Sequence, residues 1–151
     1  MKIEQLLQQA KILLSENKLN DAKIIFQNVI KFEPTNYKAY NNIGAILLKL
    51  GNLDEAEENF RKAVELNPEF VVAHYNLGII QANLLKFNEA EKSYKKAIEL
   101  KEDYTEAINN LHRMIRQNKL LLEIKDIREL KKTKASVIKI SRGLTNNPFI
   151  S

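Results

Sequence analysis

A 34-residue period runs through the first two thirds of the chain. Proline, glycine, alanine, an aromatic ring and asparagine each return at that spacing. The recurring sets are Pro34 and Pro68, Gly44 and Gly78, Ala22 with Ala56 and Ala90, Phe26 with Phe60 and Tyr94, and Asn42 with Asn76 and Asn110. A fixed period of this length, built from helical patterns, predicts a stacked array of helices and not a single globular core.

Each period contains two helical segments separated by a turn. In the second period apolar residues return at steps of three and four, which gives the first helix one apolar face. These residues are Ala39, Tyr40, Ile43, Ile46 and Leu47. Gly51 then favours a helix end, and Pro68 ends the second helix because the residue before proline is pushed out of the α region. We therefore predict an all-α fold of antiparallel helix pairs, with units at 3–36, 37–70 and 71–104.

The small and aromatic residues of the period resemble those of the tetratricopeptide repeat family. The second unit matches the family pattern at Tyr40, Ile43, Gly44, Leu47, Ala56, Phe60, Ala63 and Pro68, and the third at His74, Leu77, Gly78, Gln81, Ala90, Tyr94 and Ala97. The third unit has Glu102 where the family has proline, and the first unit matches less well. The resemblance covers about residues 3–116 and implies a right-handed α-α superhelix, or solenoid, whose first helices line a concave groove.

The resemblance also implies which side chains face that groove. The candidate peptide-binding residues are Gln8, Lys11, Lys38, Asn41, Asn42, Leu48, Val72, Tyr75, Asn76, Ile79, Asn110 and Arg113. Within this set, Leu48, Val72, Tyr75 and Ile79 are expected to form an apolar stripe. We expect Tyr75 and Ile79 to anchor an apolar side chain of a partner, since aromatic anchors dominate binding hot spots.

One row of the groove carries a primary amide in every unit. Its members are Gln8, Asn42, Asn76 and Asn110. A side-chain amide has both a donor and an acceptor, so a regular row can pair with the backbone of an extended peptide. The row resembles the asparagine ladder in the tetratricopeptide superhelix of O-linked N-acetylglucosamine transferase. Asparagine is also common at this position in the family, so an explanation without ligand binding stays open.

Some tetratricopeptide cochaperones hold the C-terminal carboxylates of heat-shock proteins with a clamp of Lys, Asn, Asn, Lys and Arg. Those five positions hold Leu7, Lys11, Asn42, Val72 and Asn76 in this chain, and only Asn42 matches. Without the clamp cations, a carboxylate loses its charge-assisted hydrogen bonds. The sequence therefore disfavours a heat-shock protein C-terminus as the partner.

Positive charge is concentrated after the repeats. Residues 1–104 carry 14 Lys and Arg against 15 Asp and Glu, whereas residues 105–151 carry 10 against 4. We predict that 105–132 forms a C-terminal capping helix or helices, since apolar residues continue at helical spacing. The pattern suggests one helix over 105–116 and another over 119–132.

The end of the chain, 133–151, is predicted to be a basic tail or linker. Residues 134–140 alternate polar and apolar side chains, which is compatible with a short strand or a linker, and coil is expected from Gly143 onward. A nucleic-acid partner is disfavoured because Phe149 is the only aromatic residue after Tyr104. A solvated tail is the ordinary interpretation, and an acidic partner is the alternative.

Residues suited to catalysis or metal binding are scarce. The chain has no cysteine, and His74 and His112 lie in different units without a carboxylate at ligand spacing. It has no glycine-rich phosphate loop and no recognisable catalytic triad. We expect no enzyme activity, no cofactor and no metal. No apolar run is long enough to span a membrane or to be a signal peptide, so we expect a cytoplasmic protein.

These observations favour a non-catalytic protein–protein interaction scaffold that binds an extended peptide or partner segment in the groove. The alternative is the N-terminal, substrate-recruiting module of a larger transferase or oxygenase, of which this chain is a fragment. Phe149 and Ile150 motivate that alternative, because they are apolar residues with no evident core to join. An ordinary frayed end explains them equally well.

Overall fold

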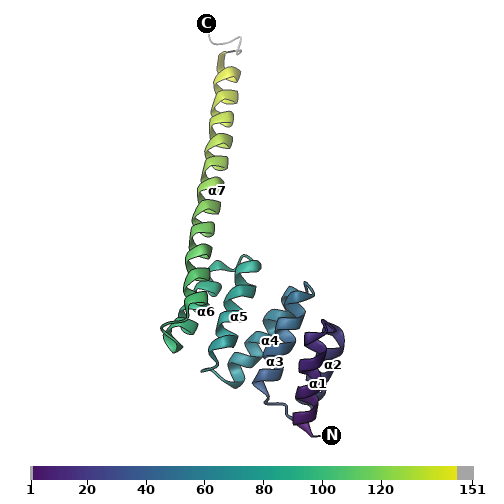
Figure 1. Ribbon diagram of the computed structural model, residues 1–151. Helices are drawn as coiled ribbons and strands as arrows, with labels where there is room; N and C mark the ends of the chain where they lie inside the picture. The colour runs from purple at the N-terminus through teal and green to yellow at the C-terminus, as the bar shows by residue number, and fades with distance from the viewer. Residues whose placement is uncertain (1, 146–151) are drawn as a thin grey trace. The chain divides into compact units, whose positions relative to one another are not determined.

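The computed structural model describes residues 2–145, which fold into seven α-helices with no strand among them (Figure 1). The helices are α1 (Ile3–Ser15), α2 (Leu19–Phe32), α3 (Tyr37–Lys49), α4 (Leu53–Leu66), α5 (Val71–Asn83), α6 (Phe87–Leu100) and α7 (Thr105–Thr145). The chain divides into two compact parts, an N-terminal part, Met1–His112, and a C-terminal part, Arg113–Ser151. The N-terminal part holds α1 to α6 and the start of α7, and the C-terminal part holds the rest of α7.

The first six helices form three pairs joined by short turns. α1 packs on α2, α3 on α4 and α5 on α6, and successive pairs meet where α2 contacts α3 and where α4 contacts α5. α3 also contacts α5, so the first helices of the second and third pairs lie next to each other. This arrangement confirms the all-α superhelix of antiparallel helix pairs that the period predicts.

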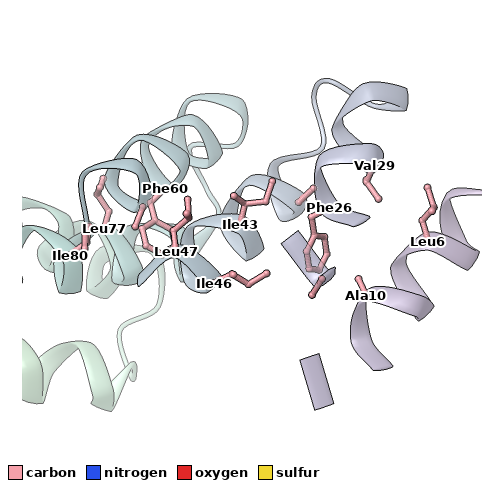
Figure 2. Close-up of a cluster of buried hydrophobic side chains, with 13 residues drawn as sticks. Leu6, Ala10, Phe26, Val29, Ile43, Ile46, Leu47, Phe60, Leu77 and Ile80 are labelled. Atoms are coloured by element: carbon pink, nitrogen blue, oxygen red, sulfur yellow. The ribbon is translucent and has the colours of Figure 1, made fainter. Parts of the chain in front are cut away.

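One apolar core continues from pair to pair (Figure 2). Its larger buried side chains are Leu6, Phe26, Val29, Ile43, Ile46, Leu47, Phe60, Leu77 and Ile80. Complete burial of one such side chain stabilises the fold by about 1.5–3 kcal/mol. A single pair would leave part of this surface in water, which is why the units depend on their neighbours.

In two of the pairs, a glycine on the first helix lies against an aromatic ring of the second helix. A Cβ atom at Gly44 would lie 2.8 Å from the ring of Phe60, and one at Gly78 would lie 2.7 Å from the ring of Tyr94. Real Cβ atoms essentially never approach a ring so closely, so any side chain here would force the ring to shift. Ala10, one period before Gly44, is fully buried in the first pair.

The turn inside each pair has the same backbone geometry. Asn17, Gly51 and Leu85 lie one period apart, and all three have a left-handed φ, of 58°, 81° and 59° respectively. Each donates its N–H to the carbonyl three residues earlier, and the next residue bonds to the carbonyl five residues earlier, which is the Schellman motif. The left-handed region suits glycine but costs most other residues about 1–2 kcal/mol, so Leu85 is strained.

A buried carboxylate links the second and third pairs. Glu57 of α4 is only 5% exposed, and it accepts hydrogen bonds from Lys86 Nζ at 2.6 Å and from Arg61 Nη2 at 2.7 Å. Arg61 also donates to Glu89 of α6 at 2.6 Å, and Gln81 of α5 lies 3.5 Å from both carboxylates. Burial by itself raises the pKa of Glu57, but the hydrogen bonds from Lys86 and Arg61 outweigh it, so the pKa is lower than its ordinary value.

The C-terminal helix differs from the sequence-based expectation. α7 is one continuous helix, Thr105–Thr145, so the predicted interruption between helices over 105–116 and 119–132 is wrong (Figure 1). The strand or linker expected over 134–140 and the coil expected at 143–145 are also wrong, because these residues are helical. No glycine or proline occurs between Thr105 and Gly143, so nothing local ends the helix. The part of the predicted tail after residue 145 lies outside the described residues.

The substitution Leu85→Gly is expected to stabilise the protein by about 1 kcal/mol, because it relieves the left-handed strain at a side chain that is 61% exposed. Urea or thermal unfolding followed by circular dichroism measures the change. Leu85→Ala is the matched control: it removes the same exposed side chain and keeps the strain, so it should add little stability. An equal gain in both variants would contradict the explanation.

The substitution Glu57→Gln is expected to lower the free energy of unfolding at pH 7 by about 1–3 kcal/mol, since it removes the charge that Lys86 and Arg61 bind. Because the folded pKa of Glu57 is lower than the unfolded value of about 4.3, its contribution is complete above that pH and is lost as the pH falls through the folded value. The difference between variant and wild type should therefore shrink below about pH 4. Denaturant titrations at several pH values check this, with exposed Glu55→Gln as the control.

Candidate functional site

The candidate groove residues lie on the first helix of each pair and on α7, as expected. Gln8 and Lys11 are on α1, Lys38, Asn41, Asn42 and Leu48 on α3, Val72, Tyr75, Asn76 and Ile79 on α5, and Asn110 and Arg113 on α7. Gln8, Lys11, Lys38, Val72 and Arg113 are exposed, Asn41 is buried, and the other six are half-buried. Arg113 belongs to the C-terminal part of the chain, whereas the other candidates belong to the N-terminal part. Their role in binding stays a prediction.

A hollow of about 310 Å³ lies where α1, α2 and α3 meet. Its lining residues are Leu7, Lys11, Leu14, Phe26, Asn36, Lys38 and Asn42. Three candidate residues therefore come together here, namely Lys11, Lys38 and Asn42. Leu7, Leu14 and Phe26 add an apolar surface beside the two cations, and this combination suits a ligand that is both acidic and apolar.

Leu7, Leu14, Phe26 and Asn36 line the hollow but are not among the candidate peptide-binding residues. Phe26 is a core residue and only 3% exposed, so its place in the period indicated packing and not a site. Asn36 closes the first unit, and its side chain accepts a hydrogen bond from the N–H of Ala39 at 2.9 Å, which caps α3. A helix cap is a readable signal, but it predicts a helix start and does not identify a neighbouring hollow.

The amide row is partly used to join successive pairs. Asn76 Nδ2 donates to Asn41 Oδ1 at 3.0 Å, and Asn110 Nδ2 donates to the Tyr75 hydroxyl at 2.9 Å. Both bonds run from one unit to the residue 35 positions earlier. They support the explanation without ligand binding that the sequence left open for these two amides.

The first junction lacks this bond. The residue 35 positions before Asn42 is Leu7, whose side chain cannot accept a hydrogen bond. Within the residues that the structure describes, the amide of Asn42 has no side-chain hydrogen bond, and it borders the hollow. Asn42 is therefore the member of the row best placed to pair with a ligand.

The predicted apolar stripe is only partly available. Tyr75 packs against Tyr104 and Tyr94, with ring centroids 5.0 Å and 6.2 Å apart. Leu48 packs against the apolar core, whereas Val72 stays 42% exposed. Burial raises the pKa of Tyr104, and the neighbouring Tyr75 adds to that effect. The ring of Tyr75 is therefore already in contact with two other rings of the protein, which leaves less of it to contact a partner.

The heat-shock clamp positions fall in two places. Leu7, Lys11 and Asn42 line the hollow, while Val72 and Asn76 lie on α5. Lys11 and Lys38 both border the hollow, so cations for a carboxylate are present there, contrary to the expectation from the clamp positions. Lys38 is not a clamp position, so a comparison of motif positions did not count it.

The histidines and acids form no recognisable reactive centre in the described part of the chain. His74 is buried, and its Nε2 donates to the backbone oxygen of Pro68 at 2.7 Å, which explains it as a packing residue. Among residues 2–145, no group of three or more His, Cys, Asp or Glu is placed to hold a metal ion. None of the described helices combines the length and the apolar character that crossing a membrane requires.

The tetratricopeptide repeat family model matches residues 37–70 and 71–104. No curated protein matches the sequence significantly.

Many solved structures share the fold. The first tetratricopeptide domain of Spaghetti (RPAP3), bound to the HSP90 peptide SRMEEVD, is 24% identical with a TM-score of 0.75, and the match covers 78% of this chain and 94% of that one. The second such domain of human RPAP3, in complex with the HSP70 peptide SGPTIEEVD, is 21% identical with a TM-score of 0.69, and the match covers 72% and 91%. A mutant O-GlcNAc transferase of Thermobaculum terrenum is 26% identical with a TM-score of 0.70, but the match covers 75% of this chain and 22% of that one.

Proposed function

Because the chain carries tetratricopeptide repeats at residues 37–70 and 71–104, we propose that it is a non-catalytic protein-interaction scaffold that binds an extended peptide. The peptide lies along the first helices, α1, α3 and α5. The hollow between α1, α2 and α3 is the part of this site that sets its ligand chemistry. In this proposal 3–104 is the repeat domain and the buried start of α7, with Ala107 and Leu111, is its C-terminal cap, whereas the predicted cap from residue 119 onward is exposed helix.

The observation that carries the proposal is the composition of the hollow. Lys11 and Lys38 can donate charge-assisted hydrogen bonds to a carboxylate, and the amide of Asn42, which bonds to no side chain within residues 2–145, can pair with a peptide group. Leu7 and Leu14 can remove an aliphatic side chain from water at about 25 cal/mol per Å² of buried apolar area. These requirements describe a peptide segment that has an acidic group beside an aliphatic residue.

Acidic C-terminal peptides therefore become test ligands. The HSP90 and HSP70 peptides in two of the similar structures both end in Glu-Glu-Val-Asp, which places acids beside a valine. These complexes are at odds with our expectation that a heat-shock protein C-terminus is disfavoured. The two lysines of the hollow give that chemistry a physical basis in this chain.

Beyond the hollow, the peptide continues over α5. Val72 offers an exposed apolar contact, and Ile79 adds a half-buried one. Asn76 has given one donor to Asn41, so we assign it a weaker role toward the ligand than Asn42. Gln8 on α1 is exposed, and we assign it to the opposite end of the peptide.

The alternative function is recruitment of a substrate segment for a larger enzyme. The match to the O-GlcNAc transferase favours it, because the aligned region is 22% of that chain. This alternative uses the same hollow and differs in what the repeats are joined to. The mass of the native protein in its source cells decides between the two.

Peptide binding is tested by fluorescence anisotropy with two labelled peptides, one ending in Glu-Glu-Val-Asp and one ending in Gln-Gln-Val-Asn with an amidated terminus. The acidic peptide should bind more tightly. The double substitution Lys11→Ala/Lys38→Ala should weaken that binding about tenfold, since each solvent-accessible ion pair contributes up to about 1 kcal/mol. Asn42→Ala should weaken binding of both peptides.

The matched control is Lys31→Ala/Lys62→Ala, which removes two exposed lysines outside the hollow and loses the same net charge. Equal losses in both double variants would mean that only net charge matters and would reject the hollow as the site. Equal affinity for the acidic and neutral peptides would reject the proposed selection for acids.

A further inference from the structure

The described residues of the C-terminal part, Arg113–Ser151, expose an unusual number of apolar side chains. Seven leucine and isoleucine residues of α7 are between 38% and 61% exposed, and six of them lie within residues 119–136. These six are Leu120, Leu121, Leu122, Ile124, Ile127 and Leu130. Monomeric proteins rarely expose a contiguous apolar surface unless it binds something. We call residues 119–136 of α7 the basic segment.

Three of these side chains share one face of the helix. Leu120, Ile124 and Ile127 follow steps of four and three, which places them one above the other. Further along, Lys131 and Lys134 continue the same face at the same spacing. The face is therefore apolar in its first half and basic in its second half.

The basic segment carries twice as many cations as acids. Its six cations are Lys119, Lys125, Arg128, Lys131, Lys132 and Lys134, against the acids Glu123, Asp126 and Glu129. All nine side chains are exposed. Within the part of the chain that the structure describes, none of the six cations forms an ion pair, whereas Lys95 and Lys96 of α6 each pair with a glutamate.

The charges and apolar side chains of the basic segment favour one class of partner over two others. A second copy packed on this face would bring Lys131 and Lys134 against the same lysines in a parallel pair, or bury them against the apolar residues in an antiparallel pair, and both arrangements oppose association. Single-stranded nucleic acid uses aromatic platforms for its bases, and residues 119–136 contain no aromatic residue. An acidic lipid surface uses both features, because leucine and isoleucine enter the acyl boundary while lysine stems extend to the headgroups.

We propose that the basic segment of α7 binds the surface of membranes that contain anionic lipids. The helix lies along the interface with Leu120, Ile124 and Ile127 toward the acyl chains. The stems of Lys131 and Lys134, further along the same face, extend back to the headgroups. Its lysines contact the anionic headgroups, and together the two contributions keep the chain on the membrane.

The test is sedimentation of the full chain with vesicles. Phosphatidylcholine vesicles and vesicles with 30% phosphatidylserine are compared at low and physiological salt. The chain should bind the anionic vesicles at least tenfold more tightly, and salt should weaken that binding. The triple substitution Leu120→Gln/Ile124→Gln/Ile127→Gln should reduce binding about tenfold or more at constant charge.

The control is Asn118→Gln/Thr133→Gln/Ser136→Gln, which makes three polar substitutions in α7 and should leave vesicle binding unchanged. Circular dichroism confirms that each variant keeps its helix content. No preference for anionic vesicles, or full binding by the apolar triple variant, would overturn the proposal. Tighter binding to a single-stranded RNA oligonucleotide than to the vesicles would also overturn it, because the partner would then be nucleic acid.

Discussion

The contact between an aromatic ring and a helix backbone without a side chain organises the repeats. The rings of Phe60 and Tyr94 lie so close to Gly44 and Gly78 that even a methyl group would displace them. Because the contact returns after one period, the second and third pairs adopt the same internal spacing. The first helices of successive units then lie in the same relative position, and side chains 35 residues apart come within hydrogen-bond distance.

Single-residue differences between the repeat units decide which side-chain amides are free to bind a ligand. The acceptor toward the next unit is Asn41 in the second unit and Tyr75 in the third, but the first unit has Leu7 at that position. Asn42 is therefore left without the bond that its counterparts make. The same leucine supplies apolar surface to the hollow, so one residue both frees the amide and shapes the proposed peptide site.

The two proposed surfaces depend on different interactions. In the hollow, a few polar groups with defined geometry act together with a limited apolar area, which suits recognition of a particular peptide. On the basic segment, many exposed cations act together with unburied leucine and isoleucine, which suits a surface without a defined pattern. Net charge predicts only the second, because residues 1–104 carry a charge close to zero and still place Lys11 and Lys38 beside one hollow.

The sequence by itself determined the period, the helix pairs and the helices that carry the candidate residues, because apolar spacing, glycine and proline act over a few residues. It also contained the reason for the continuous α7, since no glycine or proline interrupts residues 105–142, although the fading apolar pattern suggested an interruption. Only the tertiary structure decided that Lys38 and Lys11 border one hollow and that, among the described residues, the amide of Asn76 bonds to a side chain while that of Asn42 does not. These relations join different helix pairs, so they depend on how the pairs pack and not on any local pattern.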